Sequence, residues 1–115
     1  MINIRFSEDA DKGIISLKIK GHAGQAPIGQ DIVCASVSIL TYTLAQTLLF
    51  MYEEGRLIDK PVVDMDSGDA HIVCRPKDDY YGEALHTFFV AKVGYNLLAH
   101  NYPQYVDIKM FGQAE

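Results

Sequence analysis

One cysteine and one histidine stand out in the sequence, because they flank a glycine-containing connection. His22 follows a run of alternating apolar residues, and Cys34 lies twelve residues further on, at the start of a long uncharged stretch. A thiol that shares its proton with a nearby imidazole becomes a thiolate, which is the nucleophile of cysteine-dependent hydrolases. The two residues are therefore candidates for covalent catalysis, provided that the fold brings their side chains together.

The elements around this pair are expected to place it at one edge of the fold. Asp31 is the expected N-cap of a helix that stops before Gly55, so Cys34 would be its third residue. Free N–H groups and the positive end of the helix dipole favour an anion there. The N–H groups of Val33 and Cys34 would also receive the oxyanion of a tetrahedral intermediate. Since a chain reverses direction between a strand and a packed helix, His22 is expected at the same edge.

Each of these residues also has an ordinary structural interpretation. A single cysteine in an apolar helix is commonly a small buried hydrophobe, and a histidine at a strand end commonly makes one hydrogen bond. Asp31 is favoured as the cap, although its carboxylate could instead orient His22 as the third member of a triad. Ser38 lies one turn beyond Cys34 and could bond near the site or back to its own helix.

The wider pattern predicts an α+β fold of the order ββαββα(β), in which a final strand is optional. Period-two alternation indicates strands, and apolar residues at helical spacing indicate helices. We expect a two-layer sandwich with both helices on one face of a mainly antiparallel sheet. The expected strands cover residues 2–6, 15–19, 62–65, 71–75 and 106–110, and the expected helices cover residues 31–54 and 80–101, the second capped by Asp78 or Asp79 and ended by Pro103.

Composition and charge limit the class of protein. The 115 residues, 49% of them hydrophobic, predict a single domain over residues 1–115. Ten Lys and Arg against fifteen Asp and Glu give a formal charge of −5, which argues against direct nucleic-acid binding and suits a basic protein partner. The first residues lack the pattern of a secretory signal, so we expect a cytoplasmic protein with two free thiols.

We expect neither a metal nor a cofactor. Zinc ligation by His22, Cys34, His71 and Cys74 lacks any recognised ligand spacing. Cys74 is expected to pack in the core, since it alternates away from His71 on its strand.

The segment from Ile32 to Tyr52 contains no charged side chain and is long enough to span a membrane. Polar residues interrupt it and no basic flank accompanies it, so we interpret it as a helix buried within protein. A small domain cannot easily cover a helix that is apolar nearly all round. The sequence therefore predicts a homodimer and no membrane association.

The segment from Gly21 to Ser38, GHAGQAPIGQDIVCASVS, resembles the signature of the ribosomal-processing cysteine protease family, Prp. That signature runs Gly-His-Ala, a flexible loop, Gly-x-Asp, an aliphatic pair, then Cys-Ala and Val-Ser. The chain departs from it at Ser36, where a second Ala is common, and at Gln25, where an aromatic residue is frequent.

This resemblance implies a role for each matching residue. Cys34 would be the nucleophile and His22 the base, with Gly21 and Gly29 as hinges of a loop that closes over substrate. Asp31 and Ser38 would be supporting residues in the site. We carry these roles forward as expectations.

The resemblance also implies a substrate, namely the N-terminal extension of large-ribosomal-subunit protein twenty-seven. Phage-encoded relatives would instead process a capsid or scaffold precursor. The rival hypothesis is an acidic dimeric adaptor that binds a basic ribosomal or capsid protein without cutting it. A glycine-hinged loop beside a cysteine and a histidine favours the protease, because a protease needs a lid over its substrate.

Overall fold

The computed structural model describes residues 1–22, 28–66 and 68–109, with the side chains of residues 28–31 also outside the description. The elements follow the predicted order, including the optional last strand. They are β1 (Ile2–Asp9), β2 (Ile14–Lys20), α1 (Ile28–Glu53), β3 (Val62–Asp66), β4 (Asp69–Cys74), a 3₁₀ turn (Asp78–Tyr80), α2 (Tyr81–Asn101) and β5 (Val106–Lys109).

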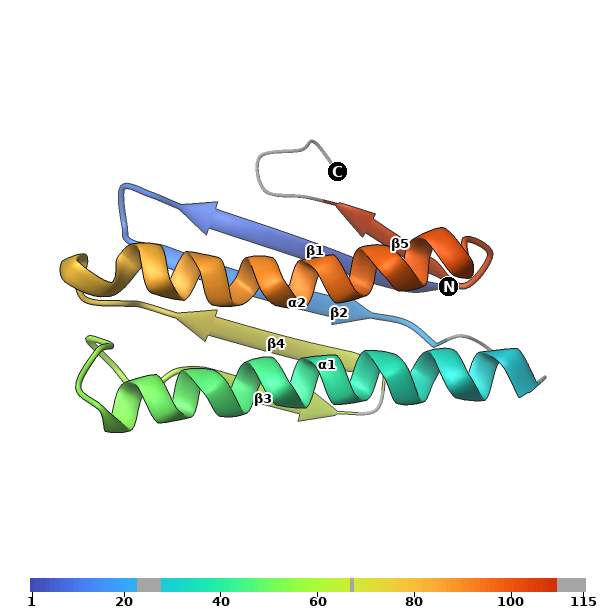
Figure 1. The fold of residues 1–115 in the computed structure, drawn as a ribbon, viewed down its shortest axis with the longest axis horizontal. Helices are drawn as coiled ribbons and strands as arrows, with labels where there is room; N and C mark the ends of the chain where they lie inside the picture. Colours follow the sequence, from blue (N-terminus) through green and yellow to red (C-terminus); the bar gives the residue numbers. More distant parts are fainter. Residues whose placement is uncertain (23–27, 67, 110–115) are drawn as a thin grey trace.

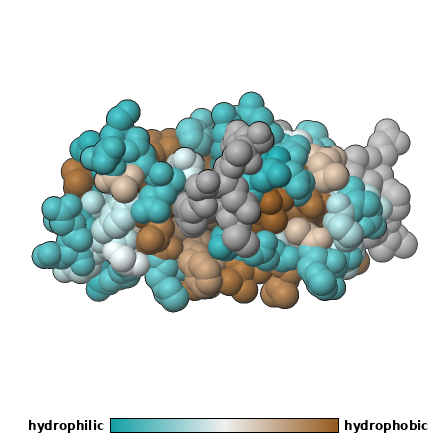
Figure 2. Space-filling model, turned by 90° about the horizontal axis from the view of Figure 1, so that it is seen from above, coloured by the Kyte–Doolittle hydropathy of each residue, from teal (hydrophilic) through white to brown (hydrophobic). Residues whose placement is uncertain are grey.

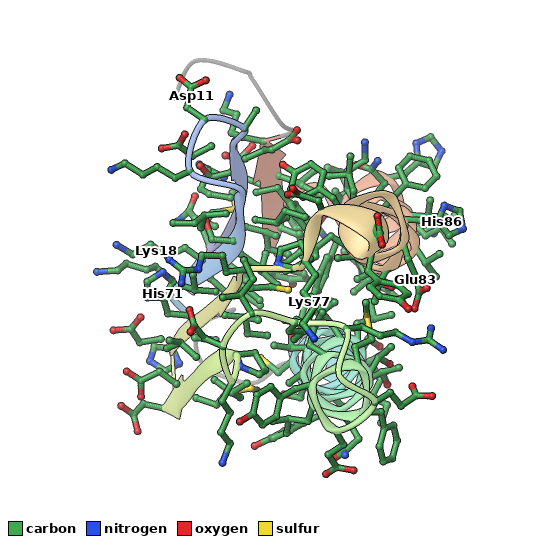
Figure 3. All side chains as sticks on the ribbon, turned by 90° about the vertical axis from the view of Figure 1, so that its left-hand side faces the viewer. Asp11, Lys18, His71, Lys77, Glu83 and His86 are labelled. Atoms are coloured by element: carbon green, nitrogen blue, oxygen red, sulfur yellow. The ribbon has the colours of Figure 1, made fainter. Side chains whose placement is uncertain are left out.

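The five strands form one mixed sheet in the order β3-β4-β2-β1-β5. Three neighbouring pairs are antiparallel, and β5 joins β1 in parallel. Both helices lie in front of this sheet in Figure 1, on the same face. The expected two-layer α+β sandwich is thereby confirmed. Figure 3 shows Lys18 and His71, which pair across β2 and β4, on the side of the sheet away from the helices.

Alternation along the strands produces the core. On each central strand every second residue faces the helices and is buried, because a sheet covered on one face turns alternate side chains inward. Burying each such side chain contributes about 1.5–3 kcal/mol. The buried residues of the first, second and fourth strands are Ile2, Ile4, Phe6, Ile15, Leu17, Ile19, Ile72 and Cys74. These are the residues whose spacing predicted the strands.

Helix α1 begins earlier than the sequence suggested. Its first residue is Ile28, so Asp31 is the fourth helical residue and Cys34 the seventh. The prediction that Asp31 is the N-cap is therefore wrong.

The other end of α1 stops as predicted. Gly55 has a φ of 77°, a left-handed conformation that glycine adopts without a Cβ clash. Its N–H bonds to the carbonyl of Tyr52 at 3.0 Å, and the next N–H, of Arg56, bonds to the carbonyl of Met51 at 2.9 Å. This double hydrogen-bond pattern satisfies carbonyls that the end of a helix would otherwise leave free.

The start of α2 differs from the expectation, whereas its end agrees with it. Its N-cap is Tyr80, without a side-chain capping bond, because residues 78–80 form a 3₁₀ turn that leads into the helix. The prediction that Asp78 or Asp79 caps α2 is therefore wrong. The helix ends at Asn101, two residues before Pro103.

Much of the apolar surface of α2 faces outward. Of the residues whose spacing predicted the helix, Phe88 is fully buried, whereas Phe89, Val93 and Leu97 are exposed. The buried face of α2 consists of Ala84, Phe88, Ala91 and Tyr95. A Cβ on Gly94 would lie 2.6 Å from a methyl group of Leu40, so glycine there permits a close approach of α2 to α1. Figure 2 shows hydrophobic residues gathered along the lower edge of the molecule, which is the helix side of Figure 1.

Helix α1 is long and apolar enough from Ile32 to Glu53 to cross a membrane by length and composition, with a mean hydropathy of 1.7. A core helix of a soluble protein passes the same test. Val33 and Leu48 of this segment are fully buried in the sandwich. The absence of membrane association remains a prediction.

Candidate active site

Four of the six predicted site residues line one pocket of about 380 Å³. They are His22 and Gly21, which follow β2, and Cys34 and Ser38 on α1. The rest of the wall comes from both helix and sheet. Further lining residues are Val37, Thr41 and Tyr42 of α1, Met65, Asp66, Gly68, Asp69 and Ala70 of the β3–β4 hairpin, and Ile2 and Ile19 of the central strands. Figure 1 shows why these segments meet: β2 ends, α1 begins and β3 turns into β4 at the right-hand end of the sandwich.

The backbone of Gly21 and His22, which follow β2, is fixed by hydrogen bonds on two sides. The N–H of Gly21 bonds to the carbonyl of Gly68 at 2.9 Å. On the other side, the nitrogen of Met1 donates to the carbonyl of His22 at 2.8 Å. Gly21 has a φ of 102°, and a Cβ there would overlap the carbonyl oxygen of Met1. Glycine is thus required at residue 21 by both its conformation and its neighbour.

Cys34 presents a free, exposed thiol to the pocket. It lies in the second turn of α1, where the N–H groups of Val33 and Cys34 point at carbonyls four residues earlier. The prediction that these two N–H groups receive an oxyanion is therefore wrong. The dipole effect also falls off within the first turn. The helix end consequently offers less stabilisation to a thiolate at Cys34 than the sequence suggested.

The structure gives a different result for each of the remaining predicted residues. Ser38 is exposed in the pocket, and within the described residues it makes no hydrogen bond to Cys34. Gly29 is the second residue of α1, so its predicted place in the loop is wrong. The side chain of Asp31 lies outside the described residues, as does the segment from residue 23 to residue 27. The hinge role of Gly21 and the supporting roles of Asp31 and Ser38 remain predictions.

The inner wall of the pocket contains a buried polar pair. Thr41 is 2% exposed, and its hydroxyl lies 2.6 Å from the phenolic oxygen of Tyr95. It also donates to the carbonyl of Val37 at 2.7 Å, so Tyr95 is the donor in the first bond. Burial raises the pKa of Tyr95, which keeps its hydroxyl protonated. These bonds tie the pocket wall on α1 to the middle of α2.

Sequence reasoning missed the residues of the β3–β4 turn. Asp66, Gly68 and Asp69, which lie between the expected strands 62–65 and 71–75, line the pocket. Their polar, glycine-containing sequence is typical of a turn, but the position of that turn depends on which strand pairs with which. Because Lys20 pairs with Asp69 across β2 and β4, the turn lies directly beside the residues that follow β2. Neither composition nor periodicity reveals that pairing.

The second cysteine differs from the first in its exposure to solvent. Cys74 is fully buried in the core, as predicted. Burial raises the pKa of its thiol to about 12, since the apolar surroundings disfavour the charged thiolate. Within the described ranges, no group of three or more His, Cys, Asp or Glu side chains could hold a metal ion.

An exposed thiol and an imidazole in one open pocket, at one edge of an α+β sandwich, are the groups that a cysteine-dependent hydrolase requires. The family model described as "Cysteine protease Prp" matches residues 1–107. The chain belongs to this family of cysteine proteases. The resemblance inferred from the segment between Gly21 and Ser38 is thereby confirmed.

Individual relatives agree with this assignment. The chain is 34% identical over 59 residues to the ribosomal processing cysteine protease Prp of Bacillus subtilis (strain 168), an alignment that spans 51% of this chain and 53% of that protein. The crystal structure of SMU.848 from Streptococcus mutans is similar with a TM-score of 0.69 at 29% identity, over 96% of this chain and 95% of the other. An essential ribosomal processing protease Prp from S. aureus, in complex with a substrate peptide, has the same fold: the TM-score is 0.69 at 20% identity, over 96% of this chain and 99% of the other.

Proposed function

We propose that this chain is a cysteine endopeptidase in which Cys34 is the nucleophile and His22 the general base. One observation carries this proposal: the exposed thiol of Cys34 and the imidazole of His22 line the same pocket. The other cysteine is buried, so it offers no competing nucleophile. Membership of a cysteine protease family supplies the reaction class.

The reaction would proceed by acyl transfer. The Cys34 sulfur gives its proton to His22 and attacks the scissile carbonyl carbon, forming a tetrahedral intermediate. The imidazolium of His22 then protonates the leaving amine as the peptide C–N bond breaks, which leaves a thioester on Cys34. Water hydrolyses this thioester: His22 takes a proton from the water, the sulfur departs, and the proton returns to the sulfur.

The imidazole must turn or move toward the thiol during this cycle. No hydrogen bond joins His22 to Cys34 within the described part of the chain, and catalytic contacts often tighten only when substrate binds. Because the backbone of Gly21 and His22 is hydrogen-bonded to Gly68 and Met1, this approach would come from rotation of the His22 side chain, and the hinge role of Gly21 remains a prediction. Substrate closure would then bring the base to the nucleophile.

The substrate we propose is the N-terminal extension of large-ribosomal-subunit protein twenty-seven, or a related phage capsid or scaffold precursor. The Bacillus subtilis relative is described as a ribosomal processing protease, and the S. aureus structure is of a ribosomal processing protease with a substrate peptide. The net charge of −5 suits a basic substrate protein. A pocket open to solvent at one end of the sandwich suits an extended peptide.

This function is tested by incubating the purified protein with ribosomal and phage precursors and reading the product masses. We expect one of the two precursors to be cut at a single bond, and both Cys34→Ala and His22→Ala to lose cleavage while remaining folded. Retained cleavage by Cys34→Ala would exclude Cys34 as the nucleophile. Tight binding of a precursor without cleavage would favour the non-catalytic adaptor.

We further propose that the protein acts as a homodimer that buries the outer face of its helices. Apolar side chains on that face are exposed along the length of both helices, an arrangement typical of an interaction surface. The exposed apolar residues are Ile32, Ile39, Tyr42, Phe50 and Tyr52 on α1 and Phe89, Val90, Val93 and Leu97 on α2.

Light scattering at micromolar concentration checks this association. We expect the mass of two chains for the native protein and of one chain for Val93→Glu, which places a charge in the middle of the buried face. A native protein with the mass of one chain would contradict the dimer. The proposed location is the cytoplasm, where a reducing environment would keep both thiols free.

A further inference from the structure

The imidazole of His22 lies directly against the backbone of Gly68. A Cβ built on Gly68 would overlap Nε2 and Cε1 of the ring and would lie 3.0 Å from Cδ2. Three of the five ring atoms therefore occupy or border the space that any other residue would fill. Ring and glycine both line the pocket that contains Cys34.

Gly68 is also fixed relative to the strand that carries His22. Its carbonyl accepts the N–H of Gly21 at 2.9 Å, and the next residue, Asp69, pairs with Lys20 of β2. The turn and the histidine are thus held together by the sheet. The φ of Gly68 is 74°, which is a second reason for glycine at this place.

We propose that Gly68 is a positioning residue for the proposed base. Because Gly68 has no side chain, the imidazole packs directly against its backbone, and this contact holds the ring within the pocket. This role rests on the proposed function of His22 as the base of Cys34. A side chain at residue 68 would push the imidazole away and change its distance from the Cys34 thiol. A displacement of about 1 Å can lower a catalytic rate about 100-fold.

The chain contains a matched control for this hypothesis. Gly13 lies in the turn between β1 and β2, at the other end of the sheet, and has a similar φ of 65°. A Cβ on Gly13 would have no neighbour within 4 Å. Gly13→Ala therefore measures only the effect of placing alanine at a positive φ. Gly68→Ala has the same effect and in addition displaces the His22 ring.

The first measurement compares kcat/KM for cleavage of the substrate peptide. We expect Gly68→Ala to lower kcat/KM by about 100-fold, chiefly through kcat, and Gly13→Ala to remain within about threefold of the native enzyme. The second measurement follows the His22 ring nitrogens by NMR during a pH titration without substrate. We expect the chemical shifts and titration midpoint to change in Gly68→Ala and to stay unchanged in Gly13→Ala.

A third measurement tests whether the methyl group of Gly68→Ala clashes with the imidazole of His22. In a His22→Ala background the imidazole is absent, so Gly68→Ala should lower the Tm only as much as Gly13→Ala does. In the native background, Gly68→Ala should lower the Tm further. This comparison needs no activity, so it still decides the contact if the proposed protease function fails. Should Gly68→Ala not fold, Gly68→Asn keeps the Cβ in a residue that tolerates positive φ.

The proposal is overturned if Gly68→Ala matches Gly13→Ala in both kcat/KM and the His22 NMR signals. It is also overturned if the extra loss of Tm persists after the imidazole is removed. A native protein that cuts neither precursor would refute the proposed function. In that case, NMR signals of the His22 ring that differ between the two glycine variants would still show that Gly68 positions the His22 ring.

Discussion

The two ends of the sandwich are built differently. At the end where α1 stops, Gly55 closes the helix with two backbone bonds, and Arg56 pairs with Glu54 and Glu83 and lies over the ring of Tyr80. Figure 3 views the molecule from this end and shows Glu83 and Lys77 at its surface. At the other end, an open pocket of about 380 Å³ separates α1 from the β3–β4 turn.

This difference suggests how a small domain can divide stability and function. The closed end has a glycine cap and two ion pairs of Arg56. The pocket end keeps an exposed thiol and holds its histidine through backbone bonds and a glycine contact. Variants at the closed end should therefore change the free energy of unfolding and leave chemistry intact, whereas variants at the pocket end should change the catalytic rate, with or without a loss of stability.

The largest difference is expected between the two thiols. At pH 7, Cys34 should react with iodoacetamide at least about 100 times faster than Cys74, because Cys74 is buried and its thiol is almost entirely protonated. Since the pKa of Cys74 is raised to about 12, its thiolate should stay scarce throughout the range from pH 6 to pH 9. Peptide mapping after timed alkylation measures both rates, and equal rates would contradict the distinction.

A medium effect is expected at the cap of α1. Gly55→Ala should lower the free energy of unfolding by about 1–2 kcal/mol, because alanine is strained at a φ of 77°. Denaturant unfolding measures this loss, and kcat/KM should stay within about twofold of the native value. A large loss of activity at native stability would show that the two ends are coupled.

The smallest effect is expected at the ion pairs beside that cap. Arg56→Ala should lower the Tm less than Gly55→Ala does, because ion pairs exposed to solvent contribute little to stability. The remaining effect should shrink in high salt, which screens such pairs. Thermal unfolding at low and high ionic strength checks both points. A loss larger than that of Gly55→Ala would mean that Arg56 closes this end more than its cap does.

The fold was largely predictable because its signals are local and repeated. Alternation in residues 2–6 and 15–19 specifies which side chains of β1 and β2 face inward, and Gly55 specifies the end of α1. The helix starts were not predictable to the residue. Asp31, Asp78 and Asp79 all have the side chain of an N-cap, but α1 begins at Ile28 and a 3₁₀ turn precedes α2.

The pocket was predictable only in part. Chain reversal after β2 was enough to bring His22 and Cys34 to one edge, because it depends on the order of elements alone. The contribution of Gly68 depends on the pairing of β2 with β4, a long-range contact that no local pattern encodes. The close approach of Gly94 to Leu40 likewise depends on how the two helices pack, which no local pattern encodes.

The pH dependence of Cys34 alkylation, in the native protein and in His22→Ala, tests the central claim most directly. Because Cys34 lies beyond the first turn of α1, the proposed mechanism requires the imidazole of His22 to supply most of the stabilisation of the thiolate. We predict that native Cys34 reacts rapidly near pH 6 and that His22→Ala reacts at least about tenfold more slowly there, like an ordinary exposed thiol. Identical profiles for the two proteins would contradict the account.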